Sequence, residues 1–118
     1  MKVSSSVYTV DANVILRYLL KDDEAQWQKA YRTIRAVNDG SVRLICDPVT
    51  LAEIVFALVS IYRLTRQRIY QLLDPLVKAE GFVVPEKDLY VRALELFGTT
   101  VPHFGDACAC EAKYLVED

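Results

Sequence analysis

VYTVDANVILRYLL, residues 7–20, joins two hydrophobic patterns of different period. Residues 7–10 are β-branched or aromatic, which is typical of a short strand, and this run stops at Asp11. Apolar residues then recur with helical spacing from Asn13 to Leu20. The segment therefore predicts a strand, a turn and a helix, which form the first half of a βαβ unit.

The same alternation of strands and helices continues along the chain. Further strands are predicted at residues 42–46 (VRLIC) and 82–84 (FVV). The predicted helices cover residues 22–37, 50–61, 66–80, 88–97 and 106–115. Strands that alternate with helices favour a parallel sheet with right-handed crossovers. We expect a single α/β domain over residues 1–118, with a short, mainly parallel sheet flanked by helices.

Capping residues and helix breakers set the predicted helix boundaries. Thr50 and Glu53 fit a capping box at the start of the third helix. Thr65 can cap the fourth helix, which Pro75 either kinks or restarts. Gly98 is predicted to end the fifth helix.

Composition and charge exclude some classes of protein. Fourteen Lys and Arg against sixteen Asp and Glu give a net charge of −2, which excludes a nucleic-acid binder that works through bulk positive charge. Arg63, Arg66 and Arg68 form the densest basic cluster. They could contact phosphates, but we interpret them first as a solvated helix start.

Cysteine use and the apolar segments predict a reduced, cytoplasmic protein with no membrane partner. The three cysteines, Cys46, Cys108 and Cys110, are odd in number and form no CxxC pair. Asp11 interrupts any signal-peptide core near the start. The most apolar stretch, residues 51–62, is shorter than the ~20 residues that span a bilayer.

Acidic residues are the candidates for chemistry. Asp11 follows the first strand, and Glu53 lies one turn into the helix after the second, so both should lie at the carboxyl edge of the sheet. Each has a structural explanation as well: Asp11 and Asp106 could be helix N-caps, and Glu53 could be half of a capping box. Carboxylates that converge repel one another unless a cation neutralises them, which favours Mg²⁺ or Mn²⁺.

Three segments resemble, in order and spacing, the acidic signatures of the PIN-domain family, and most closely its VapC-type toxins. These segments are VDANVILRYL (residues 10–19), VTLAEIVFAL (residues 49–58) and FGDACACEAKYL (residues 104–115). The resemblance implies a PIN-like three-layer α/β/α fold and a metal-dependent endoribonuclease. It further implies a cytoplasmic toxin of a type II toxin–antitoxin pair.

The resemblance also implies site residues and partners. Asp11, Glu53 and Asp106 match the family's catalytic, metal-binding carboxylates, which would hold Mg²⁺ or Mn²⁺. Asn13 and Thr50 match polar positions that support them. The implied partners are an RNA substrate, a cognate antitoxin protein and a second copy of the chain, with the homodimer formed through helices such as that of residues 52–62.

The sequence departs from the family pattern at its C-terminal end. PIN domains continue from the last helix into another strand that carries a fourth acidic or hydroxyl residue, whereas this sequence ends in YLVED. Glu117 and Asp118 are the acidic residues at this end, and we expect them to be solvated rather than to complete the site. The first strand would then keep an open edge, which predicts dimerisation, swapping or low solubility.

Two other interpretations stay open. One is a catalytically impaired PIN-like module that works by binding proteins. The other is a phosphoacceptor receiver domain, which needs an acidic pair after its first strand and an Asp after its third. Here Asp11 is followed by Ala12-Asn13 and Val84 by Pro85-Glu86, so we rank it last. His103, the only histidine, is left without a role.

Overall fold

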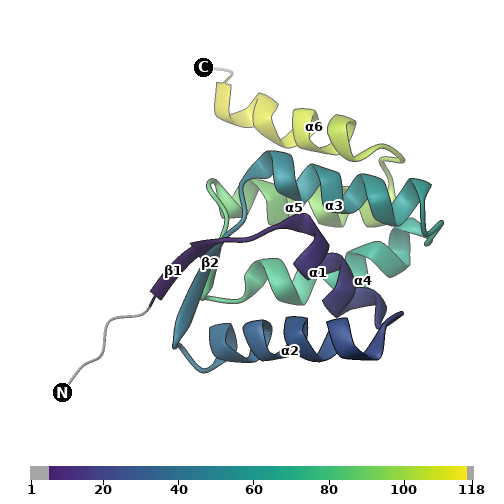
Figure 1. The fold of residues 1–118 in the computed structure, drawn as a ribbon. Helices are drawn as coiled ribbons and strands as arrows, with labels where there is room; N and C mark the ends of the chain where they lie inside the picture. The colour runs from purple at the N-terminus through teal and green to yellow at the C-terminus, as the bar shows by residue number, and fades with distance from the viewer. Residues whose placement is uncertain (1–5, 117–118) are drawn as a thin grey trace. The chain divides into compact units, whose positions relative to one another are not determined.

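The structure is a computed structural model that describes the backbone of residues 6–116 and the side chains of residues 6–112. Glu117 and Asp118 therefore lie outside the described residues. The elements follow in the order β1 (Ser6–Thr9), α1 (Ala12–Leu20), α2 (Glu24–Asn38), β2 (Val42–Ile45), α3 (Pro48–Ser60), α4 (Arg66–Lys78), β3 (Phe82–Val83), α5 (Lys87–Thr99) and α6 (Phe104–Val116) (Figure 1). The predicted α/β alternation is confirmed.

The sheet has the strand order β1-β2-β3, and both pairs of strands are parallel. In register, Tyr8 lies opposite Leu44, and Leu44 lies opposite Phe82. Backbone hydrogen bonds continue just past the strands, from Val10 N–H to the β2 side at 2.9 Å and from Cys46 N–H to the β3 side at 2.8 Å. The carboxyl ends of all three strands therefore meet at one edge of the sheet, as predicted for a parallel arrangement.

The chain divides into two compact units. Unit 1 comprises Met1–Ile54 and Ala79–Pro85, and it contains the sheet, α1, α2 and the first turns of α3. Unit 2 comprises Val55–Lys78 and Glu86–Asp118, and it contains the rest of α3 together with α4, α5 and α6. None of the helices in the described part of the chain is both long enough and apolar enough to cross a membrane.

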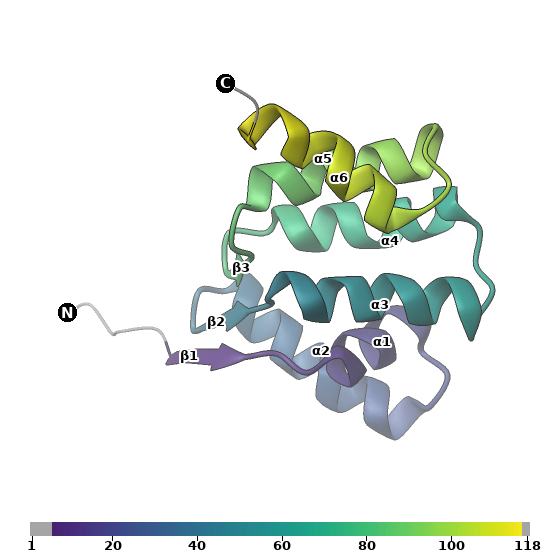
Figure 2. The ribbon, with the colours of Figure 1, turned by 90° about the horizontal axis from the view of Figure 1, so that it is seen from above.

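Unit 1 is held together by α2, which packs against β2 and α1 (Figure 2). The buried face of α2 consists of Ala30, Ile34 and Val37, which recur with helical spacing inside the predicted helix of residues 22–37. Gly81 lets the chain before β3 approach α2 closely, because a Cβ atom there would lie 2.8 Å from Cγ1 of Val37.

Unit 2 contains contacts from α4 to α5 and from α5 to α6. The rings of Phe97 in α5 and Phe104 in α6 meet edge to face at 5.9 Å. The prediction that Gly98 ends the fifth helix is wrong, because α5 continues to Thr99. Gly98 instead allows close packing, since a Cβ atom there would lie 2.7 Å from the Cβ of Tyr70 in α4.

Two helix starts also differ from prediction. The capping box of Thr50 and Glu53 is wrong, because α3 begins at Pro48 and the Asp47 carboxylate accepts the Thr50 N–H at 2.9 Å. Proline is favoured at the first helical position, where no N–H is needed. Asp106 is not an N-cap either, because α6 begins at Phe104 and Asp106 lies inside its first turn.

Other predicted boundaries are confirmed. Asp11 caps α1, and the hydroxyl of Thr65 accepts the Arg68 N–H at 3.1 Å before α4. α4 runs through Pro75 without restarting. Of the predicted basic cluster, Arg66 donates to the Phe97 carbonyl at 3.4 Å, which gives it a structural role inside unit 2.

Candidate functional site

The candidate site lies at the carboxyl edge of the sheet in unit 1, where β1 and β2 end side by side. Asp11 follows β1 after one intervening residue, and Asp47 follows β2 in the same way. Glu53 lies further along α3, the helix that leaves β2. This edge is where ligands collect in open parallel sheets, because helix N-termini and loops converge there.

Asp11 is fixed by its role as the N-cap of α1. Its backbone is extended, with φ −88° and ψ 140°, and its Oδ1 accepts the Asn13 N–H at 2.7 Å. The side chain is exposed, and the described residues place no hydrogen bond or ion pair on Oδ2. One carboxylate oxygen therefore holds the side chain in place while the other faces solvent.

Glu53 has no comparable structural role. It lies in the second turn of α3 and is exposed, so its carboxylate cannot cap that helix. The described residues supply neither a hydrogen-bond donor nor a cation to it. Glu53 is therefore not half of a capping box, and its carboxylate is available to a ligand.

The sequence pattern does not identify Asp47 as a site residue, because it predicts that the third helix begins at residue 50, whereas α3 begins at Pro48. It is half-buried, and its carboxylate caps α3. The signal that could have found it is the Asp-Pro pair after a strand, since Pro at the first helical position follows an N-cap. Asp47 adds a third carboxylate to the residues that follow the strand ends of unit 1.

The two supporting residues are both tied to a cap. The backbone N–H of Asn13 binds Asp11, and that of Thr50 binds Asp47, at 2.7 and 2.9 Å. The Asn13 side chain is exposed and that of Thr50 is half-buried. Their support of a catalytic carboxylate stays a prediction.

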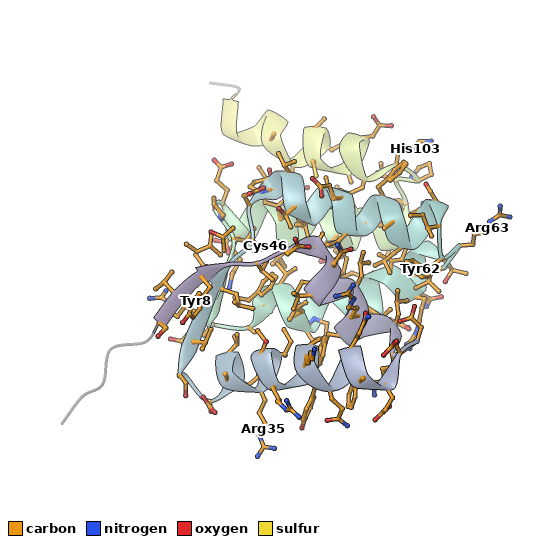
Figure 3. All side chains as sticks on the ribbon, in the orientation of Figure 1. Tyr8, Arg35, Cys46, Tyr62, Arg63 and His103 are labelled. Atoms are coloured by element: carbon orange, nitrogen blue, oxygen red, sulfur yellow. The ribbon has the colours of Figure 1, made fainter. Side chains whose placement is uncertain are left out.

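Asp106 belongs to unit 2. It is exposed in the first turn of α6, shortly after His103, which is also exposed and is labelled in Figure 3. No described residue donates a hydrogen bond to its carboxylate. Its membership in one site with Asp11 and Glu53 stays a prediction from the resemblance.

Carboxylates are the groups of unit 1 that fit a divalent cation. Mg²⁺ is commonly held by one or two carboxylates together with water and phosphate oxygens, and Asp11 and Glu53 offer that type of donor. Within the described part of the chain, no three His, Cys, Asp or Glu side chains gather closely enough to hold a metal ion by themselves.

Cys46 lies between β2 and Asp47, and its thiol is expected to be unreactive. Its side chain, which is labelled in Figure 3, is fully buried. Burial, and to a smaller extent the negative charge of Asp47, raises the pKa of the Cys46 thiol to about 12. A thiol with this pKa stays neutral at physiological pH, so it offers neither a nucleophile nor a thiolate ligand.

Comparison of the chain with protein-family models, with curated proteins and with solved structures finds no match. Function is therefore inferred from the residues at the carboxyl edge of the sheet. Two features are available for that inference: a capped and oriented Asp11, and a Glu53 that has no structural role.

Proposed function

We propose that this chain is a metal-dependent endoribonuclease that acts as the toxin of a type II toxin–antitoxin pair. The observation that carries the proposal is the state of Glu53, which is exposed and unpaired among the described residues in the helix that leaves β2. Asp11 follows the neighbouring parallel strand with one carboxylate oxygen facing solvent. The resemblance to PIN domains supplies the class of reaction and adds Asp106.

The carboxylates of Asp11 and Glu53 act as oxygen ligands in this proposal. The N-cap bond to Asn13 orients Asp11 before any ligand arrives, which lowers the conformational cost of binding. When bound, Mg²⁺ or Mn²⁺ supplies Lewis acidity toward a phosphodiester oxygen and lowers the pKa of a water. The Cys46 thiol, which precedes Asp47, takes no part because it stays protonated.

The substrate is RNA in this proposal, and the protein itself does little to attract it by charge. The net charge is −2, so a polyanion is not drawn to the chain as a whole. Among the basic cluster, Arg63 and Arg68 are exposed, whereas Arg66 is held by Phe97. Local contacts with phosphates and the bound cation would therefore hold the RNA.

A homodimer is part of the same proposal. Four large apolar side chains are exposed in and just after the second half of α3, within unit 2. They are Phe56 and Ile61, each 67% exposed, Val59, 41%, and Tyr62, 39%. We call these four side chains the apolar surface of unit 2, and exposed apolar side chains of this size favour a site of protein association. An antitoxin or a second copy of the chain would cover it.

Cleavage of a labelled, structured RNA in the presence of Mn²⁺ tests the proposal. We expect Asp11→Asn and Glu53→Gln each to lower the rate by at least about a hundredfold, as when one stabilising ligand is removed from an active site. Glu80→Gln is the matched control, because Glu80 is an exposed carboxylate at the amino end of β3. EDTA should abolish the activity.

Two results would contradict the nuclease. The first is cleavage that persists in EDTA. The second is cleavage by Glu53→Gln at the rate of Glu80→Gln, which would indicate a contaminating nuclease. Either result would favour the alternative interpretation, a catalytically impaired module that binds proteins.

A further inference from the structure

β1 lies at an edge of the described sheet, and its outer side has no partner strand. Ser6 and Val10 donate their N–H groups toward the β2 side, at 3.2 and 2.9 Å. Because backbone groups alternate along a strand, the N–H and C=O of Val7 and Thr9 point to the opposite side. Over residues 6–116, no strand pairs with that side. The edge is therefore a template for an added strand.

An apolar groove of about 480 Å³ follows this edge and is lined by both β1 and α2. Tyr8, which is 57% exposed and labelled in Figure 3, lies in register with Leu44, so both side chains are on the same face of the sheet. Val10 adds to the β1 side, and Ala36 lines the groove from α2. Apolar side chains of an added strand would find a hydrophobic surface here.

A second groove of about 270 Å³ adjoins the first and is cationic. The two grooves share Val14 and Thr33, so they adjoin between α2 and the part of α1 that follows the carboxyl end of β1. Arg17 and Lys29 line the second groove, and Arg32 lines the first. All three cations are exposed, and the described residues form no ion pair with them. Asp11 is the one acidic residue in either lining.

We propose that this edge binds an extended, acidic segment of a partner protein, which joins the sheet as a strand parallel to β1. Its backbone would pair with Val7 and Thr9, and every second side chain would enter the apolar groove. Because a parallel strand ends beside the cationic groove, acidic residues at the carboxyl end of the segment would lie near Arg17 and Lys29.

The charges favour a partner segment over a second copy of β1. Residues 1–10 contain no Asp or Glu, so the β1 of another molecule would bring no carboxylate to the three cations. Burying Arg17, Lys29 and Arg32 without an opposite charge is unfavourable. An acidic segment neutralises them and fits the apolar edge at the same time.

Two peptides test the charge preference. The probe is a fluorescein-labelled peptide of alternating valine and threonine that ends in three glutamates. The control peptide has the same label and the same alternating segment but ends in three lysines. We expect fluorescence anisotropy to show that the glutamate peptide binds at least about tenfold more tightly at low salt. The solution contains no RNA and no divalent cation, so the outcome is independent of the proposed nuclease.

Paired variants test the position of the peptide. Arg32→Glu should weaken binding of the glutamate peptide by at least about fivefold, whereas Arg35→Glu should leave it within about twofold, because Arg35 points away from the sheet (Figure 3). Val7→Pro removes an outward N–H and should weaken binding by about fivefold or more, whereas Val7→Thr retains that donor.

Three results would overturn the proposal. The first is equal affinity for the glutamate and lysine peptides, and the second is unchanged binding by Arg32→Glu or Val7→Pro. The third is a dimer that forms without peptide and is lost in Val7→Pro but kept in Val7→Thr. That last result would assign the edge to a second copy of the chain.

Discussion

Asp11 and Glu53 differ in what holds them. Asp11 is tied to the start of α1 by the 2.7 Å bond from Asn13, so a replacement that cannot cap, such as Asp11→Ala, affects both the helix and any ligand, whereas Asp11→Asn retains a capping oxygen. Loss of such a cap costs about 1 kcal/mol of stability. Glu53 has no such bond among the described residues, so its replacement reports on the ligand alone. Glu53→Gln therefore tests the ligand without any change at a helix cap.

Cys46 and Cys108 should react more slowly than the exposed Cys110. Burial raises the pKa of Cys46 to about 12 and that of Cys108 to about 11, while Cys110 is exposed. At pH 8 a thiol of pKa about 12 is ionised to only about one part in ten thousand, and the thiolate is the reactive form. Iodoacetamide labelling followed by peptide mass spectrometry should modify Cys110 first and Cys46 last.

A different order of labelling would be informative. Early modification of Cys46 in the folded protein would show that the carboxyl end of β2 opens readily. Labelling in urea is the control, because unfolding should make the three thiols react at similar rates.

At the scale of elements, close packing of α4 against α5 depends on Gly98. Adding a methyl group there would place it 2.7 Å from Tyr70 Cβ, inside van der Waals contact. Overpacking of this kind costs about 1–3 kcal/mol, which exceeds the gain of up to about 1 kcal/mol from replacing a helical glycine by alanine. We expect Gly98→Ala to lower the free energy of unfolding by about 1–2 kcal/mol in a urea titration.

Gly105→Ala is the matched control for that experiment. Gly105 lies in the first turn of α6, and a Cβ atom there meets nothing within 4 Å. The variant should be neutral or more stable, by up to about 1 kcal/mol. Equal stability of Gly98→Ala and Gly105→Ala would contradict the packing of α4 against α5.

Gly98 also shows where sequence patterns fail to predict an element. A glycine after a periodic apolar run resembles a helix stop, and nothing local distinguishes it from a glycine that admits a side chain from a distant helix. Gly98 and Tyr70 are far apart in the sequence, so their contact depends on the tertiary fold. The three strands, by contrast, carry their signal locally, and each predicted strand lies within one residue of its observed bounds.

The candidate site was predictable only in part, for a related reason. The strand ends place Asp11 by local pattern, and its cap was expected. The spacing of Thr50 and Glu53 imitates a capping box and predicts a helix start at Thr50, whereas α3 begins at Pro48 with Asp47 as its cap. Which carboxylates share a ligand depends on tertiary placement, which no local pattern encodes.

At the scale of the whole molecule, the exposed apolar surface of unit 2 predicts self-association. Phe56→Glu places a charge on that surface, where burial in a dimer would be costly. We expect sedimentation velocity to show a dimer for the native chain and a monomer for Phe56→Glu at the same concentration. Gln67→Glu, which adds the same charge at an exposed position of α4, should remain dimeric.

A monomeric native chain would contradict the homodimer. It would leave Phe56 and its neighbours to another partner, such as the antitoxin of the proposed pair. The proposed nuclease would still stand, because its carboxylates, Asp11, Glu53 and Asp106, are not among these apolar residues.

The most direct test of the proposed function is the position of a bound cation, which can be measured without knowing the RNA target. Paramagnetic Mn²⁺ broadens NMR signals of nearby nuclei. At less than one equivalent of Mn²⁺, we predict broadening of the amide signals of Asp11 and Glu53, and the resemblance to PIN domains adds Asp106. Excess Mg²⁺ should reverse the effect, since both cations prefer oxygen ligands.

The acidic start of α2, with Asp22 and Asp23 exposed, serves as an internal control for weak surface binding. Asp11 and Glu53 should lose their signals at a lower Mn²⁺ concentration than Asp22 and Asp23 do. Broadening that begins at Asp22 and Asp23, or that is uniform over the exposed carboxylates, would contradict a cation site at the carboxyl edge of the sheet.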